Sequence, residues 1–445
     1  MVIARPITGK YRTIKSYIRN ILFAVFLILP FIRIDDIPLL LIDIPARKFF
    51  IFGLTIWPQE LYFLHLLLMI AGIALFAVTA LFGRIWCGYA CPQTLFTEVY
   101  DIVGRFVSGN RLGKKGQLQT PIRIWVYSVW MILSLFFSIV LLAYFKPFEE
   151  IIKDIASANF FASPYSWVPA VWVVFVALST GAAWFNMTFF RENLCKYVCP
   201  YGRFQAALLD QHSPIVSYSV LRGEPRRDRQ TQKVGQHEGE CINCDLCVMV
   251  CPTGIDIRDG LQIGCLSCGL CVDACTHVMA GFNLKSLIDY RTIRQATEPE
   301  AKVNYLRPRT VIYASLLFAL TGVFTALLVK RVPIYANIVR DKAISNIYIP
   351  NMGWQNGYEI HVGNQSHQNL QVQIKPNGND AHLKVIRSDD TLSIAGGGYE
   401  RIRYIVQYPE SAGKPDGMVL PISFTVVDIN NPKHSKIIES SFTFP

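Results

Sequence analysis

Eight cysteines in one short stretch of the chain have the spacing of iron–sulfur cluster ligands. The pattern C-x2-C-x2-C-x3-C occurs twice between positions 241 and 275, and the first copy ends in Cys251-Pro252. In bacterial ferredoxins this run holds two [4Fe–4S] clusters, and the fourth cysteine of each copy binds the other cluster. The spacing therefore predicts two crossed ligand sets. They are Cys241, Cys244, Cys247 and Cys275 for one cluster, and Cys265, Cys268, Cys271 and Cys251 for the second.

A pair of zinc knuckles is the competing interpretation of these cysteines. Zinc takes four ligands per site, usually from two separated C-x2-C pairs, and triple C-x2-C-x2-C runs fit that arrangement poorly. Thr276 stands where a second Cys-Pro would be usual, which changes the local turn but removes no ligand. We therefore expect a protein that transfers electrons one at a time.

The four remaining cysteines form an internal repeat of C-x3-C-P. Cys87 and Cys91 follow one apolar segment, Cys195 and Cys199 follow another, and the offset is 195 − 87 = 108 residues. A residue before proline avoids the α region, so the second cysteine of each pair is expected at a turn. The proline would then be the first residue of the next helix. The nearby helix N-terminus is expected to lower the pKa of the thiols and favour the thiolate.

Several chemistries suit two such pairs of thiols. Soft sulfur donors select Cu(I), zinc or the iron of an iron–sulfur cluster. A two-coordinate Cu(I) site needs one pair, whereas tetrahedral zinc or a third cluster needs both pairs. Redox-active dithiols are a further alternative, and so are small buried residues at a helix-packing seam. We take Cys87, Cys91, Cys195 and Cys199 as candidate copper thiolates and as the catalytic residues.

The composition indicates that these cysteines are carried by a membrane protein. Hydrophobic residues make up 52% of the chain and charged residues 17%. Five apolar segments are long enough, or nearly so, to span a bilayer. They cover 17–34, 60–82, 122–145, 167–190 and 310–329. The net charge of +11 is not a nucleic-acid signal, because the basic residues gather at the ends of these segments.

The basic residues also predict the orientation in a bacterial inner membrane. They precede the first span and follow the second and fourth, which places the N-terminus and the clusters in the cytoplasm. Five spans then leave the C-terminus in the periplasm. The N-terminal apolar run has no small-residue cleavage site after it, so we expect no cleaved signal peptide.

The expected fold class is a multi-domain membrane protein with an α-helical transmembrane bundle. Residues 1–222 contain four spans in two hairpins, each ending in C-x3-C-P. Residues 223–308 form a cytoplasmic two-cluster ferredoxin-like module, with a linker at 223–234 and a helical return at 284–308. The fifth span is 309–330. Residues 347–445 show short alternating runs separated by turn signals, which predict an all-β sandwich.

Several of these motifs carry a resemblance to a known family. They are Trp86-Cys-Gly-Tyr-Ala-Cys-Pro-Gln, Cys195-Lys-Tyr-Val-Cys-Pro-Tyr-Gly-Arg-Phe-Gln and Cys251-Pro-Thr-Gly-Ile-Asp-Ile. Over nearly its whole length the chain resembles the cytochrome c oxidase accessory proteins of the FixG, RdxA and CcoG type. The resemblance implies a role in assembling a copper-containing oxidase, with reduction of Cu(II) to Cu(I) as the chemistry. It also implies that the outer domain is immunoglobulin-like.

On this interpretation the hairpin thiols receive Cu(II), the clusters supply the electron, and Cu(I) passes to a copper exporter or chaperone. The outer domain would dock oxidase subunits or other assembly factors, and the electron donor is unknown. Quinol dehydrogenases of the NapH type share the hairpins and the cluster run, so a quinol-linked electron conduit is the alternative function. A non-catalytic assembly scaffold with structural clusters is a third.

Overall fold

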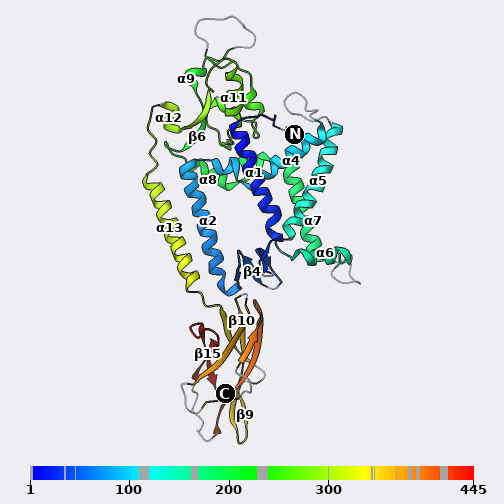
Figure 1. Cartoon of the computed structure of the whole chain (residues 1–445), viewed down its shortest axis with the longest axis vertical. Coiled ribbons are helices and arrows are strands. Elements are labelled where there is room, and N and C mark those ends of the chain that lie inside the picture. The colour runs from blue at the N-terminus through cyan, green and yellow to red at the C-terminus, as the bar shows by residue number, and fades with distance from the viewer. Residues whose placement is uncertain are drawn as a thin grey trace. The chain divides into compact units, whose positions relative to one another are not determined.

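The computed structural model describes most of the chain in two compact units. The described residues are 4–34, 37–45, 47–109, 120–161, 169–227, 239–298, 300–341, 344, 346–366, 368–378, 383–386, 391–410 and 419–444. The first unit comprises Met1–Ile32, Pro38–Ile42 and Leu64–Gly322, and the second comprises Arg33–Ile37, Asp43–Phe63 and Val323–Pro445. Figure 1 labels the elements of both units along the chain. Most of the linker predicted at 223–234 lies outside the described residues.

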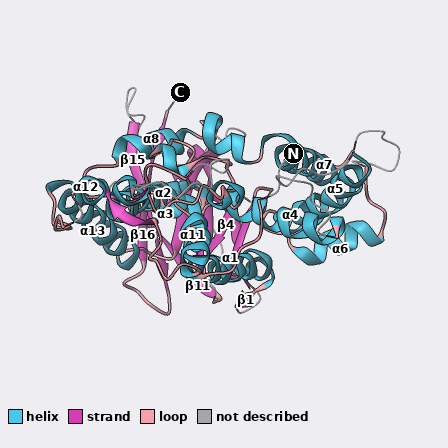
Figure 2. Cartoon of the chain, turned by 90° about the horizontal axis from the view of Figure 1, so that it is seen from above, coloured by secondary structure: helices cyan, strands magenta, loops and turns pink. Residues whose placement is uncertain are grey.

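Among the described residues, five helices are long and apolar enough to cross a membrane. They are α1 (Lys10–Ile28), α2 (Leu61–Phe82), α5 (Thr120–Leu142), α7 (Val171–Phe185) and α13 (Pro308–Val329). α7 continues into a π-helical turn, Asn186–Phe190. α5 packs against both α7 and α4 (Pro92–Ser108), and Figure 2 shows these three helices as one group. The group encloses an aromatic core around Tyr100 and Trp130.

The first span begins earlier than the sequence predicts. α1 starts at Lys10, whereas the apolar run starts at position 17. The polar first turns are helical because two carboxylates from elsewhere in the unit support them. Asp273 accepts the backbone N–H groups of Tyr11 and Arg12 at 3.2 and 2.7 Å, and a carboxylate at a helix N-terminus is stabilising.

The second of these carboxylates belongs to Glu98 of α4. It is buried and forms ion pairs with Arg12 at 2.5 Å, Lys15 at 3.3 Å and Arg19 at 2.6 Å. Lys15 is itself only 2% exposed. The basic residues before the first span therefore fasten α1 to α4, in addition to any part they play in orientation.

Short elements connect the spans of the first unit. α3 (Ile85–Tyr89) follows α2, and α6 (Phe148–Ala156) follows α5. A second π-helical turn, Leu194–Val198, leads into α8 (Pro200–Leu208). The module after α8, green in Figure 1, contains β6 (Pro214–Tyr218), α9 (Val220–Gly223), α10 (Leu246–Met249), the 3-10 turn Ile257–Asp259, α11 (Leu270–Ala280), β7 (Ile288–Thr292) and α12 (Ile293–Thr297).

The helix predicted over 284–308 is largely wrong. Residues Ile288–Thr292 form β7, which pairs antiparallel with β6 so that Tyr290 lies opposite Val216. Ile288 is buried with Val216 in the core of the cluster module, and that burial outweighs the polar character of the surrounding segment. Among the described residues of this region, only α12 and the first residue of α13 are helical. The pairing holds the segment on the module before the chain returns to α13.

The second unit is the predicted all-β sandwich. One sheet has the order β12-β14-β10-β8, with β9 also paired to β10, and the other has the order β13-β11-β15-β16. The space between the sheets is filled by four almost fully buried aromatic side chains, Tyr358, Tyr404, Phe424 and Phe442. The strands are β8 (Ile334–Asp341), β9 (Ile347–Ile349), β10 (Gly353–Asn364), β11 (Leu370–Gly378), β12 (Lys384–Ile386), β13 (Thr391–Ile394), β14 (Tyr399–Tyr408), β15 (Val419–Asp428) and β16 (Ser435–Thr443).

The segment between the first two spans also contributes to this second unit. It contains β1 (Arg33–Ile34), β2 (Ile37–Pro38), β3 (Leu40–Asp43), β4 (Lys48–Ile51), β5 (Leu54–Ile56) and the 3-10 turn Pro58–Glu60. Trp57 stacks on Tyr335 with ring centroids 6.0 Å apart. Glu60 pairs with Arg331 at 2.6 Å. Arg331 after the last span is therefore held by a carboxylate of the segment between the first two spans.

Candidate electron-transfer site

Each of the two predicted ligand sets lines its own cavity in the cluster module. Cys241, Cys244, Cys247 and Cys275 surround one cavity, together with apolar residues such as Leu287. A second cavity is lined by Cys251, Cys265, Cys268 and Cys271, and also by Cys247. The structure thus places the four cysteines of each predicted set around a common cavity. Which sulfur binds which iron stays a prediction.

The two ligand loops repeat the same backbone conformation. In the first loop Asn243 and Asp245 have φ of 53° and 56°, and in the second Ser267 and Gly269 have φ of 50° and 74°. These residues occupy equivalent places between the cysteines of the two copies. Asn, Asp and Gly are the residues that adopt the left-handed region most readily. Two such residues per loop curl the backbone around the cavity and turn three sulfurs inward.

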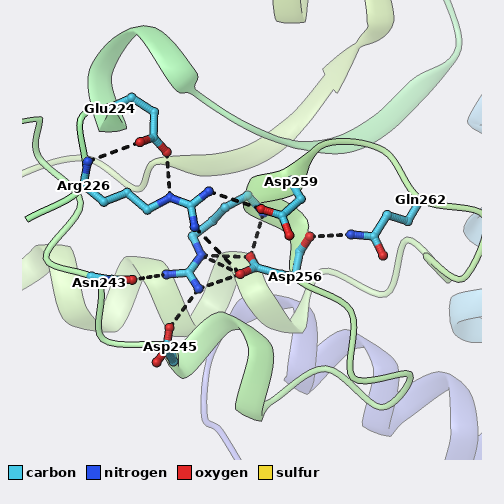
Figure 3. A network of polar contacts seen from close by, with 8 residues as sticks. Glu224, Arg226, Asn243, Asp245, Asp256, Asp259 and Gln262 are labelled. Carbon is cyan, nitrogen blue, oxygen red and sulfur yellow. Dashed lines mark hydrogen bonds and ion pairs between the residues drawn. The ribbon is translucent and has the colours of Figure 1, made fainter. Parts of the chain in front are cut away.

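One buried arginine ties the first ligand loop to the segment after Cys251. Arg258 donates to Asn243 Oδ1 and Asp245 Oδ1, each at 2.8 Å. It also binds both carboxylate oxygens of Asp256, and these hydrogen bonds lower the pKa of Asp256. Figure 3 shows this network together with Arg226, which bonds to Glu224 and Asp259 at its outer side.

The surroundings of the cysteines suit [4Fe–4S] clusters. Cys241, Cys247, Cys265 and Cys268 are buried, and the cavities between them are lined mainly by apolar side chains. The backbone N–H of Leu287 points at Cys275 Sγ from 3.4 Å. Hydrogen bonds to sulfur and exclusion of solvent are two of the factors that set cluster potentials. The residues present therefore fit two clusters, each of which would transfer one electron at a time.

The four hairpin cysteines also lie together. Cys87 interacts electrostatically with Cys91, Cys195 and Cys199, although the two pairs are 108 residues apart in sequence. Cys91 and Cys199 are the N-cap residues of α4 and α8, with extended backbone, and each is followed by proline at the first helical position. The predicted turn geometry is confirmed. The Cys87 thiol donates a hydrogen bond to Oε1 of the buried Gln205 at 3.2 Å.

The expectation of a lowered thiol pKa is wrong for the first cysteine of each pair. Burial and, to a smaller extent, the neighbouring cysteines raise the pKa of Cys87 to about 12, while Arg84 acts in the opposite direction. Burial likewise raises the pKa of Cys195 to about 12. Cys87 and Cys195 lie five residues before the first residues of α4 and α8, so the loss of hydration outweighs the effect of the helix N-terminus on their pKa.

Both hairpins contact the loops that carry the second ligand set. Gly88 lies so close to the cluster module that a Cβ there would be 2.7 Å from Leu266 O and 3.0 Å from Cys268 Cα. Lys196 donates to Thr253 O at 2.5 Å, two residues after Cys251. Because 196 − 88 = 108, these two residues occupy the same place in the hairpin repeat. The two copies of the C-x3-C-P repeat therefore contact the loops of the second ligand set through the same repeat position.

Arg84 adds a charged link between hairpin and cluster loop. It is 3% exposed, and its guanidinium donates to the carbonyl oxygens of Ile263 at 2.5 Å and Cys265 at 3.2 Å. It interacts electrostatically with both Cys87 and Cys265. A cation between a hairpin thiol and a cluster ligand stabilises negative charge on either side of it.

The hairpin thiols do not form a preassembled site for one metal ion. Within the part of the chain that the structure describes, no three His, Cys, Asp or Glu side chains gather closely enough to hold one. Nothing in this geometry selects a four-thiolate zinc site. A Cu(I) site with two thiolate ligands needs only one pair of these cysteines, and it stays a prediction.

Comparison with known proteins agrees with this architecture. Protein RdxA of Cereibacter sphaeroides is 32% identical over 97% of this chain and 94% of its own length. The chain belongs to the RdxA family. Nitrogen fixation protein FixG of Rhizobium meliloti is 33% identical over 64% of the chain and 56% of its own length. Protein RdxB of Cereibacter sphaeroides is 33% identical over 84% of the chain and 81% of its own length.

Family descriptions match the parts of this RdxA-family chain separately. Residues 190–293 match a 4Fe-4S dicluster domain, and residues 64–111 match a 4Fe-4S binding domain. Residues 324–445 match the Ig-like fold at the C-terminus of FixG. The chain is thus a membrane-associated iron–sulfur electron-transfer protein of the FixG/RdxA type, with an immunoglobulin-like domain at its C-terminal end. The family match of 64–111 includes Cys87 and Cys91 as its only cysteines.

Sequence reasoning missed the residues that join hairpins to clusters in this RdxA-family chain. In the sequence, Arg84 and Lys196 are simply basic residues that follow the second and fourth spans, and Gly88 is one residue of a C-x3-C-P motif. The signal that could have found them was the repeat, because Gly88 and Lys196 share one register position between the two cysteines. A small residue and a long donor at that position both allow close approach to another backbone.

Proposed function

We propose that this protein reduces Cu(II) to Cu(I) at its hairpin thiols and so assists assembly of a cytochrome c oxidase. The observation that carries the proposal is the docking of both C-x3-C hairpins on the loops of the second cluster. Gly88 lies against Cys268, and it is the residue next to Cys87. An electron held by that cluster would therefore have a short path to a copper ion bound by the hairpin thiols.

The chemistry of the thiols supports a one-electron reduction of bound copper. Sulfur ligands prefer Cu(I) to Cu(II), so a site with Cys87 and Cys195 favours the reduced ion. Their pKa values of about 12 mean that copper must displace their protons, and metal binding to thiols releases protons in this way. Each Cu(II) takes one electron and becomes Cu(I), and the sulfurs themselves are not oxidised.

The proposal includes an orientation and partners. The alternation of basic residues supports a cytoplasmic N-terminus and cluster module, with the immunoglobulin-like domain in the periplasm. Cu(I) would pass to a copper exporter or chaperone on the cytoplasmic side. The outer domain would dock oxidase subunits or other assembly factors, because it contains no cysteine that could bind copper.

The test is Cu(II) reduction by anaerobically purified protein that has been reduced beforehand, followed with a Cu(I)-specific chelator. Wild type is compared with a variant carrying Cys87→Ala, Cys91→Ala, Cys195→Ala and Cys199→Ala, after iron analysis shows equal cluster content. The proposal expects rapid reduction by wild type and little by the variant. Equal rates would mean that the clusters reduce copper without these thiols, and the copper role of the hairpins would be abandoned.

A further inference from the structure

An apolar pocket lies beside the second cluster loop at one end of α1 and α2. Its walls come from both spans, from α3 and from β7, which are all parts of the first unit. α1 contributes residues near its beginning and α2 one near its end, so the pocket lies where these two spans leave the bilayer. The lining residues are Tyr11, Ile14, Ile18, Val78, Ile85, Trp86, Tyr89, Ala90 and Tyr290.

The inner wall of the pocket is connected directly to a predicted cluster ligand. The Tyr89 hydroxyl donates to the carbonyl oxygen of Cys268 at 3.1 Å, and the Tyr290 hydroxyl donates to that of Ser267 at 2.6 Å. The ring of Tyr11 packs at a tilt against that of Tyr290, with centroids 5.0 Å apart, and it also lies against Gly269. Three phenol rings therefore separate the pocket from the loop 267–269.

The outer wall is apolar and open. Ile14 is 39% exposed, and Ile85 and Trp86 are each 36% exposed. Ile14 belongs to a helix long and apolar enough to cross a membrane, and tryptophan is typical of the membrane interface. A ligand could thus enter from the lipid while its head reaches the phenols. Such a ligand must combine an apolar tail with a flat polar head.

We propose that this pocket binds a membrane quinol and that the quinol is the electron donor of the protein. The aromatic walls suit a flat ring, and the phenol oxygens of Tyr89 and Tyr290, which donate to the cluster loop, keep lone pairs that could accept hydrogen bonds from a quinol. The position at the bilayer surface fits a lipid-soluble donor. Tyr89 lines the pocket and is hydrogen-bonded to the predicted ligand Cys268, so an electron leaving the ring would have a short path to that cluster. The proposal goes beyond the copper step and does not depend on it.

The electrons and protons released by one quinol can be accounted for with two [4Fe–4S] clusters. Oxidation of one quinol breaks its two O–H bonds and yields the quinone, two protons and two electrons. The electrons leave one at a time, and two clusters can hold one each. Asp289 is exposed, precedes Tyr290 and interacts electrostatically with Tyr11, so its carboxylate can receive the protons and pass them to water. One quinol would thus supply the electrons for two cupric ions.

The experiment uses the full-length, cluster-loaded protein in lipid nanodiscs, without copper. Binding is measured by photo-crosslinking of an azido-ubiquinone and mapping of the labelled peptides. Electron transfer is measured anaerobically, as bleaching of the visible iron–sulfur absorbance on addition of decylubiquinol. The proposal expects labelling of the peptide that contains Trp86 and Tyr89, and bleaching of both clusters.

Ile14→Trp fills the pocket from its open side, away from the cluster loop. We expect it to weaken quinone binding by about tenfold or more, equivalent to about 1.4 kcal/mol of binding free energy, and to slow bleaching. Bleaching by dithionite should be unchanged. Ile21→Trp is the matched control, since Ile21 is an exposed isoleucine of the same helix that does not line the pocket.

Three results would overturn the proposal. They are labelling elsewhere, equal behaviour of the two tryptophan variants, and labelling of the pocket without any bleaching by decylubiquinol, which would make it a lipid site. Copper reduction by dithionite-reduced protein would still be observed in each case if the proposed function is correct. The experiments therefore distinguish a wrong proposal about the quinol donor from a wrong proposal about copper reduction.

Discussion

Gly88, between the two cysteines of the first hairpin, lies against Cys268, a predicted ligand of the second cluster. A Cβ at Gly88 would be 3.0 Å from Cys268 Cα and 3.1 Å from its backbone nitrogen. These neighbours are backbone atoms, so they cannot move aside as the end of a long side chain would. The absence of a side chain at this position therefore fixes the closeness of the hairpin thiols to the cluster loop.

Gly88→Ala should slow electron transfer from the clusters to the hairpin thiols while leaving both the clusters and the thiols in place. The added Cβ must push α3 away from the loop 266–268, and small misplacements of reacting groups cost roughly tenfold to hundredfold in rate. We expect slower Cu(II) reduction by dithionite-reduced protein, at unchanged iron content. Gly72→Ala is the control, because nothing lies within 4 Å of a Cβ at that glycine. Equal rates for the two variants would show that the contact does not matter.

Single serine substitutions test the crossed ligand sets. Cys251 lines the cavity of Cys265, Cys268 and Cys271 and not the one that Cys275 lines. Cys251→Ser and Cys271→Ser should therefore alter the same cluster, and Cys275→Ser should alter the other one. Electron paramagnetic resonance of the reduced protein resolves which of the two signals changes. If Cys251→Ser and Cys275→Ser perturb the same signal, the crossed assignment is incorrect.

The ligand loops of the cluster module can be predicted from sequence because the residues that define each loop are close together in the chain. Two or three residues between successive cysteines suffice to define each ligand loop, and residues such as Asn243 and Gly269 favour the backbone conformation that the loops need. Alternation of apolar residues likewise identified the sandwich strands. The polar character of the segment predicted a helix where β7 forms. Ile288 is buried there because β7 pairs with a strand about 70 residues earlier, and no local sequence pattern reveals that partner.

The docking of hairpins on clusters could not be predicted in this way. The hydrogen bond between Tyr89 and Cys268 joins residues 179 positions apart, and the ion pair between Arg12 and Glu98 joins residues 86 apart. A basic residue near a span has the same appearance in sequence whether it faces lipid headgroups or a buried carboxylate. The thiol pKa was mispredicted for the same reason, since burial of Cys87 comes from distant elements such as Gln205 of α8.

Arg258→Gln should weaken the cluster module, and the first cluster in particular. It removes the hydrogen bonds that hold Asn243 and Asp245 on the ligand loop and the side-chain hydrogen bonds to Asp256. A loss of about 2 kcal/mol is expected for a charged network of this kind. Iron content after purification and the reduced-state resonance signals measure the effect. Arg226→Gln is the matched control, because its ion pairs with Glu224 and Asp259 are more exposed and should matter less.

Glu98 should make the stability of the first unit sensitive to acid. Burial alone would raise the pKa of Glu98, but the charges of Lys15, Arg12 and Arg19 together outweigh it, so the pKa is lowered from 4.5. The folded state therefore holds this proton less tightly than the unfolded state. The stabilisation is present above the unfolded pKa and is lost as the pH falls through the lower folded value.

Thermal unfolding in detergent should accordingly show a decrease in midpoint below about pH 4.5 that is smaller in Glu98→Gln. At neutral pH the variant should already be less stable than wild type, because three cations lose their shared carboxylate. Glu149→Gln, an exposed glutamate of α6, serves as the control. An unchanged acid transition in Glu98→Gln would mean that other groups govern it.

The affinity of the hairpin thiols for Cu(I) should rise with pH. Burial raises the pKa of Cys87 and Cys195 to about 12, so both are protonated throughout the neutral range. Copper must displace these protons, and each proton released makes the affinity increase about tenfold per pH unit. Competition with a Cu(I) chelator between about pH 6 and about pH 9 should therefore give a steep dependence, which flattens in a Cys87→Ser, Cys195→Ser variant. An affinity for Cu(I) that stays constant over this range in wild type would show that copper binds elsewhere.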